Sequence, residues 1–334
     1  MKRASMNLFL SRRMLLAGAA VLTAGVLSGQ ANAQQPSWPS KPVRIIVPYP
    51  AGGVGDLGTR AFATRLSARI GQPVMVENMP GGTQIIGMQA LIKAPPDGHT
   101  LILASPTSLV LNPALRVSLP YAPEKLTVIS KLFNSPLFVI ASNKLQANTI
   151  SELVAYAKAN PEAVHYASTG EGSATHLASA LFAQMAGVQM KHVPYKGSAD
   201  ANVDLMNGQI QLHFDPGAGT LALVRDGRLK AIAVSGLQRS RSLPNVPTVI
   251  EAGLPGYDVH SWWALAAPEG TPPAVAEQIA AAVKQIVADP SLAEQGLKLA
   301  IDYGATTPTE SAAFVESERR RWGQVIQTLG LKRQ

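Results

Sequence analysis

The chain has 334 residues and no cysteine, which excludes a disulfide framework and a lipid-attachment cysteine. Its formal net charge is +8, but four of the 29 Lys and Arg and none of the 21 Asp and Glu lie in the first 33 residues. The remaining 25 basic and 21 acidic residues give +4, a charge too small to predict a nucleic-acid partner. About 300 residues suffice for two α/β domains.

The first 33 residues have the pattern of an export signal. A basic start containing Arg12 and Arg13 leads into the apolar stretch Met14–Leu27, which is too short for a membrane span. An A-x-A cleavage pattern follows at Ala31 and Ala33. Paired arginines occur in both twin-arginine and ordinary secretory signals, so the route stays open. We predict a soluble periplasmic protein, cleaved after Ala33.

The stretch Val43–Arg60 predicts a strand, a glycine-rich loop and a helix. Val43–Val47 is apolar and β-branched, and a helical pattern begins near Asp56. The free N–H groups and the dipole of that helix N-terminus favour an anion. Gly52 and Gly53 are therefore candidates to present N–H groups to an anionic ligand; the alternative is a turn that merely needs glycine. The stretch matches neither a dinucleotide motif nor a P-loop.

Strands and helices alternate along most of the chain, which predicts an α/β fold with parallel-type sheets covered by helices. Further strands are expected at 73–79, 100–105, 126–132, 137–142, 163–169, 191–195, 210–215, 229–235 and 260–267. Helices are expected at 85–92, 149–158, 174–186, 198–206, 218–225, 271–288 and 307–329. Two of the strands are interpreted as crossovers, so that 34–138 and 262–334 form one lobe and 139–261 the other.

Polar residues follow several predicted strands, at the edge of a sheet where ligands collect. Ser105 and Thr107 follow one strand, and Tyr195 and Asp215 end two others. Asp215 has three possible roles: orienting His176, receiving a ligand ammonium, or capping the next helix.

A second glycine-rich loop, Thr169–Ser173, leads into another helix. Ser173 is its expected N-cap, and its N-terminus would point into the same space as the first if the lobes face each other. The helix dipole disfavours a cation at His176, so this residue is expected to be neutral. It either lines a cleft or is a buried, satisfied histidine.

Taken together, the motifs resemble the Bug family, the extracytoplasmic solute receptors of tripartite tricarboxylate transporters. The resemblance spans nearly the whole chain after residue 33. It rests on VPYPAGGVGD followed by Arg60, Glu77–Gly81, Pro96–Gly98, Thr169–Ser173 with His176, His192–Gly197, Leu243–Thr248 and Ala267–Pro272.

The resemblance implies a two-lobed, type II-like periplasmic binding protein that closes like a clamshell on a small carboxylated solute. The expected solutes are amino acids, di- and tricarboxylates or aromatic acids, and the expected partners are membrane transporter subunits. In this family the two glycine-rich loops hold a carboxylate through backbone groups and water. The predicted ligand-binding residues are Tyr49, Ala51, Gly52, Gly53, Asp56, Ser105, Thr107, Thr169, Gly170, Ser173, His176, Tyr195 and Asp215.

The chain departs from the family pattern at several positions. Relatives commonly have phenylalanine at Tyr49, arginine at Met79, and Ala-Gly-Gly at residues 82–84, where this chain has Gly82, Thr83 and Gln84. Either the Thr83–Gln84 turn lines the cleft and contacts the far end of the ligand, or these differences are surface drift.

Asp56 is unexpected beside an anion site because its carboxylate would repel the ligand. Its possible roles are to cap the helix, to hold a water, or to pair with an amino group of the ligand. The third role would keep amino acids among the candidate solutes.

Other function classes have less support in the sequence. No HExxH motif, cysteine or acidic cluster predicts a metal site, and no cofactor is expected. Ser173 and His176 are three residues apart, but Gly-Glu-Gly-Ser-Ala is not a nucleophile elbow, so we predict a non-enzyme and keep an exported serine hydrolase as an alternative. We expect a monomer. A receptor that signals to a membrane sensor instead of feeding a transporter is a further alternative.

Overall fold

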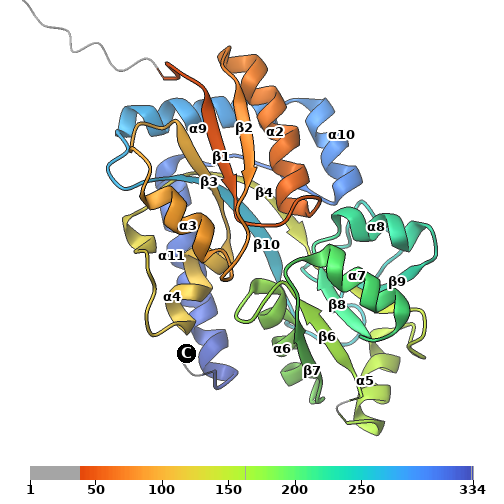
Figure 1. Cartoon of the computed structure of the whole chain (residues 1–334). Helices are drawn as coiled ribbons and strands as arrows, with labels where there is room; N and C mark the ends of the chain where they lie inside the picture. Colours follow the sequence, from red (N-terminus) through yellow and green to blue (C-terminus); the bar gives the residue numbers. More distant parts are fainter. Residues whose placement is uncertain (1–37, 162, 332, 334) are drawn as a thin grey trace, which may run out of the picture. The chain divides into compact units, whose positions relative to one another are not determined.

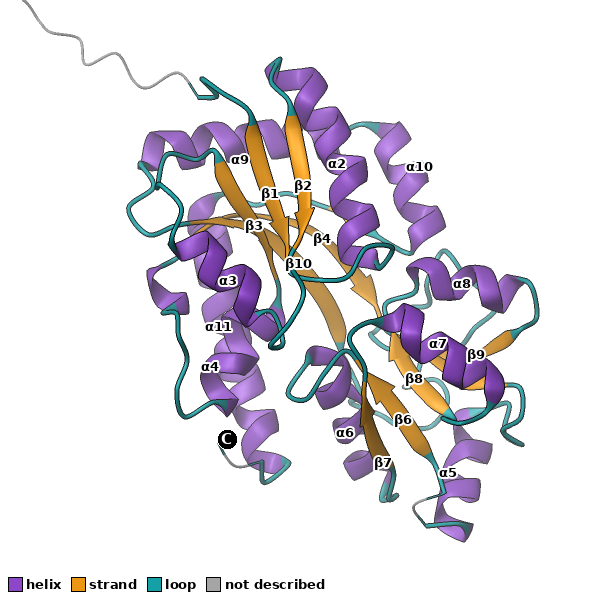
Figure 2. Ribbon diagram, viewed as in Figure 1, coloured by secondary structure: helices purple, strands orange, loops and turns teal. Residues whose placement is uncertain are grey.

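The computed structural model describes residues 38–161, 163–331 and 333, so the predicted export signal and its cleavage site lie outside the described residues. The described residues form two sheets covered by helices (Figures 1 and 2). The first sheet has the strand order β11-β4-β10-β3-β1-β2, and the second has the order β7-β6-β8-β5-β9. We call each sheet with its helices a lobe. None of the described helices is both long and apolar enough to cross a membrane.

The strands lie close to the predicted ranges, except for the two-residue strand β11, which was not predicted. Their bounds are β1 Val43–Val47, β2 Val74–Asn78, β3 Thr100–Ala104, β4 Thr127–Pro136, β5 Phe138–Ser142, β6 His165–Ser168, β7 Lys191–Pro194, β8 Leu212–Asp215, β9 Leu229–Val234, β10 His260–Ala267 and β11 Asp302–Tyr303. The chain changes from the first sheet to the second at Leu137 and returns between β9 and β10. The lobe limits at 138/139 and 261/262 stay a prediction.

The helices also follow the predicted pattern, with additions. Their bounds are α2 Val54–Ile70, α3 Ile85–Ile92, α4 Asn112–Leu115, α5 Ile150–Ala159, α6 Ala174–Ala186, α7 Ser198–Asn207, α8 Ala218–Arg225, α9 Pro273–Val287, α10 Pro290–Leu299 and α11 Pro308–Thr328, with a π-helix η1 at Thr107–Leu111 and a 3₁₀ turn η2 at Pro123–Lys125. The sequence analysis missed α10, η1 and α4. A separate helix, α10, begins shortly after α9 ends, because Asp289 caps its N-terminus and Pro290 occupies its first position.

The expectation of parallel-type sheets is correct for only part of each sheet. Strand β1 pairs in parallel with β2 and β3, and β6 pairs in parallel with β7 and β8. In contrast, β10 is antiparallel to β3 and β4, and β5 is antiparallel to β8 and β9. The physical reason is connectivity: β5 follows β4 after one residue, and β10 returns from the other lobe, so neither ends a helical crossover within its sheet.

Successive side chains along the strands of the first sheet point to opposite faces, and so the core around this sheet has two layers. Val43, Ile45 and Val47 of β1 face the layer of α2 and α9, whereas Ile46 faces the layer of α3 and α11. A strand buried on both faces is mostly apolar, and four of the five residues of β1 are; the exception, Arg44, is only partly buried and donates to Glu77 Oε2. The sheet is therefore covered on both faces, and its strand ends are left for polar loops.

Three predicted helix starts have the expected caps. Ser173 accepts a hydrogen bond from His176 N, and Thr307 with Glu310 forms a complete capping box. Thr149 accepts a hydrogen bond from Glu152 N as predicted, but the Glu152 carboxylate reaches Asn148 N. These local signals were readable because each involves residues within one turn.

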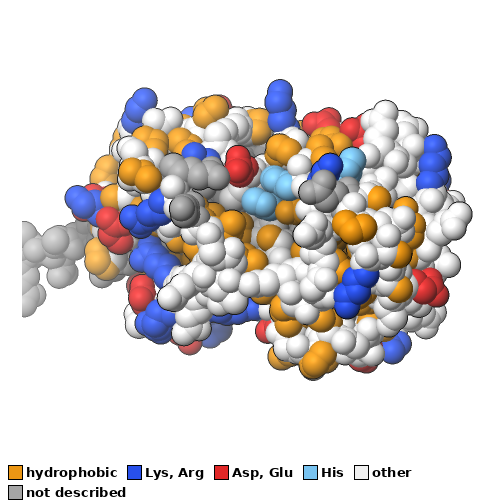
Figure 3. Space-filling model, turned by 90° about the horizontal axis from the view of Figure 1, so that it is seen from below, with side chains coloured by type: hydrophobic (Ala, Val, Ile, Leu, Met, Phe, Trp, Pro, Cys, Tyr) orange, Lys and Arg blue, Asp and Glu red, His pale blue; other side chains and the backbone are white. Residues whose placement is uncertain are grey.

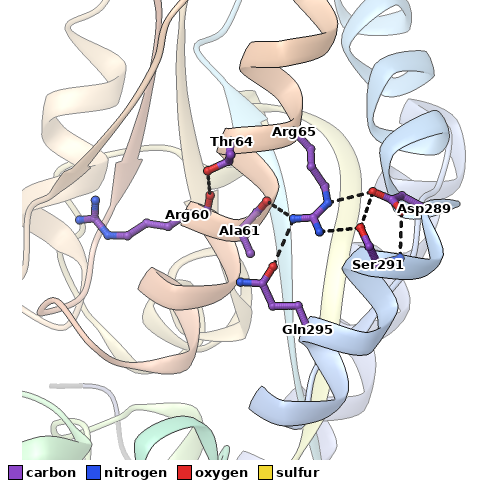
Figure 4. Close-up of polar contacts among 7 residues, drawn as sticks. All are labelled: Arg60, Ala61, Thr64, Arg65, Asp289, Ser291 and Gln295. Atoms are coloured by element: carbon purple, nitrogen blue, oxygen red, sulfur yellow. Dashed lines mark hydrogen bonds and ion pairs between the residues drawn. The ribbon is translucent and has the colours of Figure 1, made fainter.

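Arg65 of α2 joins this helix to α10 (Figure 4). Its guanidinium donates to Asp289 Oδ2 at 3.0 Å, to Ser291 Oγ at 2.9 Å and to Gln295 Oε1 at 3.2 Å. Asp289 also accepts a hydrogen bond from Ser291 N, so Arg65 contacts the residue that caps α10. One side chain thus connects α10 to the layer that covers β1.

We expect Arg65→Met to loosen α10, because methionine keeps the apolar stem and removes every donor. Amide exchange in residues 290–299 should become faster, and the melting temperature should fall. Arg69→Met, at an exposed position of the last turn of α2, is the matched control and should change neither. Unchanged exchange in α10 of the Arg65 variant would contradict the assigned role.

Candidate functional site

A cavity of about 100 Å³ lies where strand ends of both lobes meet. We call it the first compartment; it is lined by Tyr49, Pro50, Ala51, Gly53, Val54, Gly55, Ser105, Thr107, Ser261 and Trp263 of the first lobe and by Thr169, Ala174, Thr175, Gly197, Ser198, Ala199, Asp200 and Pro216 of the second. A neighbouring cavity of about 380 Å³, the second compartment, shares Tyr49, Thr107 and Thr169 with it. The second compartment is further lined by residues 80–84, Gly170, Ser173, Tyr195 and Lys196.

Three helices begin at the first compartment. Helices α2, α6 and α7 contribute their first residues to its lining, and the N-caps Gly53 and Gly197 of α2 and α7 make no side-chain cap. The N–H groups of α2 and α7 that lack a side-chain cap, and the positive ends of three helix dipoles, therefore converge on one space, whereas in α6 the N–H groups of Ala174 and His176 are already paired. Among the described lining residues, Asp200 alone carries a charged side chain. The compartment thus attracts an anion through its backbone.

The two glycines of the first loop have different roles. Gly52 has φ +87°, a conformation that favours glycine, and its N–H donates to Asp56 Oδ2 at 2.9 Å. Gly52 does not line the first compartment, so the structure does not place its N–H there. Gly53 has φ −80°, which any residue adopts, and a Cβ there would meet nothing within 4 Å. The backbone conformation at residue 53 does not require glycine. The missing side chain leaves open space at the wall of the first compartment.

Asp56 holds the first loop in place. Its carboxylate is 2% exposed and accepts hydrogen bonds from Gly52 N, from Arg60 Nε at 2.8 Å and from Asn78 Nδ2 at 2.9 Å. Asn78 also donates to the carbonyl of Tyr49. Asp56 does not line the first compartment. Asp56 makes no side-chain cap of α2, because the N–H that it accepts belongs to Gly52, outside the helix; its contacts anchor the loop and pair it with Arg60.

The second loop presents a cluster of hydroxyl groups. Thr175 Oγ1 accepts a hydrogen bond from Thr169 N at 2.9 Å and lies 3.1 Å from Ser173 Oγ. Ala174 N, at the start of α6, donates to Thr107 Oγ1 of the other lobe at 3.3 Å. Thr107 begins the buried π-helix η1, a type of turn common at functional sites. The two lobes are therefore in hydrogen-bonded contact at the first compartment.

Tyr49 stands between the compartments in a network of hydrogen bonds. Its hydroxyl accepts from Gln84 Nε2 at 2.7 Å and from Trp263 Nε1 at 3.2 Å, and Gln84 Oε1 accepts from Ser105 Oγ at 3.0 Å. Burial raises the pKa of the Tyr49 phenol, and its hydrogen bonds to Ser105, Trp263 and Gln84 lower it in part. The phenol is therefore neutral at physiological pH.

His176 lies away from both compartments, contrary to its predicted position in the ligand site. Its Nδ1 accepts a hydrogen bond from Gly172 N at 3.0 Å, and its ring stacks on His192 with centroids 3.9 Å apart. Histidine side chains gather in a hollow of the lower face (Figure 3). Burial lowers the pKa of His176, and burial with the neighbouring His176 lowers the pKa of His192 to about 4. His176 is neutral and partly buried, and it lines a third cavity together with Leu115 and Arg116 of the first lobe, outside the two compartments.

The same geometry opposes the serine hydrolase alternative. Ser173 Oγ accepts from the backbone N–H of His176, and the imidazole Nδ1 is engaged by Gly172 N. The ring is thus not oriented as a base toward the hydroxyl.

The remaining predicted residues are divided between cavities. Gly170 and Tyr195 line the second compartment, and the Tyr195 hydroxyl donates to Asp204 Oδ2 at 2.7 Å. Asp215 lines a different cavity, accepts a hydrogen bond from Gly217 N at 2.6 Å and lies 3.4 Å from His213 Nδ1. Its contacts are those of a cap before α8, and it does not orient His176.

Several lining residues were not predicted. Gly197 and Ser198 lie between β7 and the start of α7. They form the same strand, glycine and helix pattern as the first loop, and this pattern could have predicted them. Thr175 and Trp263 had no such signal, since one lies inside a helix and the other inside a strand.

The family model for the tripartite tricarboxylate transporter family receptor matches residues 59–331. A Pseudomonas protein named for the tcbD-tcbE intergenic region is 35% identical over 95% of this chain and 94% of its own length. The protein BugT of Bordetella pertussis is 32% identical over 97% and 99%.

Solved structures are similar over their full length. One, of an R. palustris protein with adipate, has a TM-score of 0.86 at 30% identity and covers 89% of this chain and 100% of its own. The periplasmic binding protein BugD has a TM-score of 0.83 at 31% identity, with the same coverage. A third, MatC from Rhodopseudomonas palustris with bound malate, has a TM-score of 0.79 at 29% identity and covers 86% and 100%.

These similarities confirm the predicted two-lobed α/β fold of a periplasmic binding protein, in which each lobe is a sheet covered by helices. They cover both lobes and extend to within a few residues of the end of the chain. The chain belongs to the Bug-type receptor family of the tripartite tricarboxylate transporters.

Proposed function

We propose that this protein is a periplasmic receptor that binds a small carboxylated solute in the first compartment and delivers it to a tripartite tricarboxylate-type membrane transporter. The observation that carries the proposal is the convergence of three helix N-termini on a cavity whose described lining contains no cationic side chain. The solved relatives bound to adipate and malate support a carboxylate as the ligand. The export signal at residues 1–33 would direct the chain to the periplasm.

The carboxylate is held by backbone N–H groups at the uncapped starts of α2 and α7, and the dipole of α6 adds to the attraction. Helix dipoles at these positions stabilise negative charge, most strongly where water is excluded. The neutral Tyr49 and the hydroxyls of Thr107, Thr169 and Thr175 add donors that do not depend on pH in the neutral range. Asp56 is occupied by Arg60, Asn78 and Gly52, so it does not repel the ligand.

Binding occurs by closure of the two lobes. Contacts between them surround the compartment: Thr107 with Ala174, Thr83 Oγ1 with Glu171 O at 3.4 Å, and Pro50 against Gly197, where a Cβ would lie 3.2 Å from the proline ring. A solute that touches both lobes stabilises the closed form and shifts the population toward it. The transporter would then recognise this closed form.

The proposal is tested by a thermal-shift screen of residues 34–334 against adipate, malate, citrate, aspartate and benzoate. A ligand at about one hundred times its dissociation constant adds about 2.7 kcal/mol, which raises the melting temperature by several degrees. We expect such a shift from one carboxylate class, confirmed by calorimetry. Bound ligand is removed first by unfolding and refolding. No shift from any carboxylate would contradict the receptor function.

Gly53→Val should abolish binding of the solute found in the screen. The backbone at residue 53 accepts valine without strain, and the side chain would occupy open space at the compartment wall. The circular dichroism spectrum should therefore stay unchanged while calorimetric heat disappears. Gly323→Val is the matched control, because that glycine is exposed on α11 and a Cβ there also meets nothing within 4 Å. Full affinity of the Gly53 variant would remove this loop from the site.

Closure predicts a change of size in solution. Small-angle scattering of the ligand-free protein should give a larger radius of gyration than the protein with saturating solute, whose curve should match the structure described here. Closure would be contradicted by identical curves at a solute concentration that calorimetry shows to be saturating.

A further inference from the structure

Two polar side chains that lie 35 positions apart in the chain meet in the structure. The hydroxyl of Tyr49 accepts a hydrogen bond of 2.7 Å from Gln84 Nε2. Neither group alone would have this partner.

Buried neighbours hold the pair rigidly. Trp263 Nε1 donates to the Tyr49 hydroxyl, and Ser105 Oγ donates to Gln84 Oε1. Gln84 is 5% exposed, Ser105 2% and Trp263 4%. Since each of these polar groups is fixed by another, the network is a preorganised wall and not a flexible surface feature.

The backbone of the turn gives a second, independent sign of function. Thr83 and Gln84 have φ values of +53° and +75°, in the left-handed region that favours glycine. The chain therefore carries two side chains where the backbone is better suited to glycine. Such outliers are kept where the side chains have a role. For Gln84, the contact with Tyr49 supplies one.

The wall stands between the two compartments. Tyr49 lines both, and Gln84 lines the second. The amide nitrogen of Gln84 has two hydrogens, and among the described residues only Tyr49 accepts one. The exposed Lys196 lines the second compartment as well. This space therefore offers a neutral donor and a cation to whatever enters it.

We propose that the Tyr49–Gln84 pair determines specificity, by selecting a linear dicarboxylate over a monocarboxylate of the same length. This inference rests on the proposed function: one carboxylate occupies the first compartment, and the chain of the solute passes Tyr49. The second carboxylate of the solute accepts a hydrogen bond from the second N–H of the Gln84 amide and lies near Lys196. An alkyl end would instead cover these polar groups without pairing them, which is unfavourable.

The test is calorimetry with two matched pairs of probes, adipate with hexanoate and succinate with butyrate. The variants are Tyr49→Phe, which removes the hydroxyl, Gln84→Gly, which removes the amide, and the double variant. We expect the unaltered protein to prefer one dicarboxylate over its monocarboxylate. Each single variant should reduce that preference about tenfold, as expected for loss of a hydrogen bond to a charged group. The double variant should lose no more than either single variant, because the two residues act as one unit.

Ala300→Gly is the matched backbone control. Ala300 is another non-glycine residue with positive φ, +57°, and it lines neither compartment. Its replacement relieves the same backbone conformation and should leave the preference unchanged. Melting curves of all variants verify that they are folded, and glycine suits the φ of residue 84.

The outcomes separate this inference from the proposed function. Binding of no carboxylate in the thermal-shift screen would refute the receptor function itself. Equal affinity of the unaltered protein for both members of each pair, or an unchanged preference in all three variants, would overturn the specificity role and leave the receptor function intact. Additive losses in the double variant would also overturn it, because they would mean that the residues act separately.

Discussion

The parallel pairing of β1 with β2 and β3 is the constraint on which the site depends. Parallel strands bring their carboxyl ends to one edge, so the loops after β1 and β3 meet there. Strand β6 does the same in the second lobe, between β7 and β8. Because helices follow these strands, their N-termini are carried to the same edges, and facing edges place them around one cavity.

Asp56 converts this topology into a defined binding loop. A glycine-rich loop at a helix N-terminus is conformationally free, and an unanchored loop would lose entropy on binding. The carboxylate of Asp56 fixes Gly52 through its N–H and is itself neutralised by Arg60. The charge that looks unfavourable beside an anion site is thus buried in a pair, and the loop can present the backbone near Gly53 to a ligand.

Contacts between the lobes lie beside the cavity, where a receptor needs both closure and ligand binding. Thr107 meets Ala174 beside the first compartment, so the proposed closure and the proposed ligand contact would involve the same residues. The turn at Thr83 and Gln84 adds a contact to Glu171 and a wall beside Tyr49, at positions where glycine would suit the backbone better. In the proposed function, carboxylate capture therefore depends on backbone geometry, whereas the proposed selection depends on the side chains of Tyr49 and Gln84.

The sequence by itself determined the alternation of strands and helices, the caps at Ser173 and Thr307, and the two glycine-rich loops, because each is set by residues close in the chain. The family resemblance supplied the two-lobed architecture. Only the tertiary structure decided the antiparallel direction of β5 and β10, the burial of Asp56, the turn of His176 away from the compartments and the meeting of Tyr49 with Gln84. These features depend on contacts between segments far apart in the chain, which no local pattern encodes.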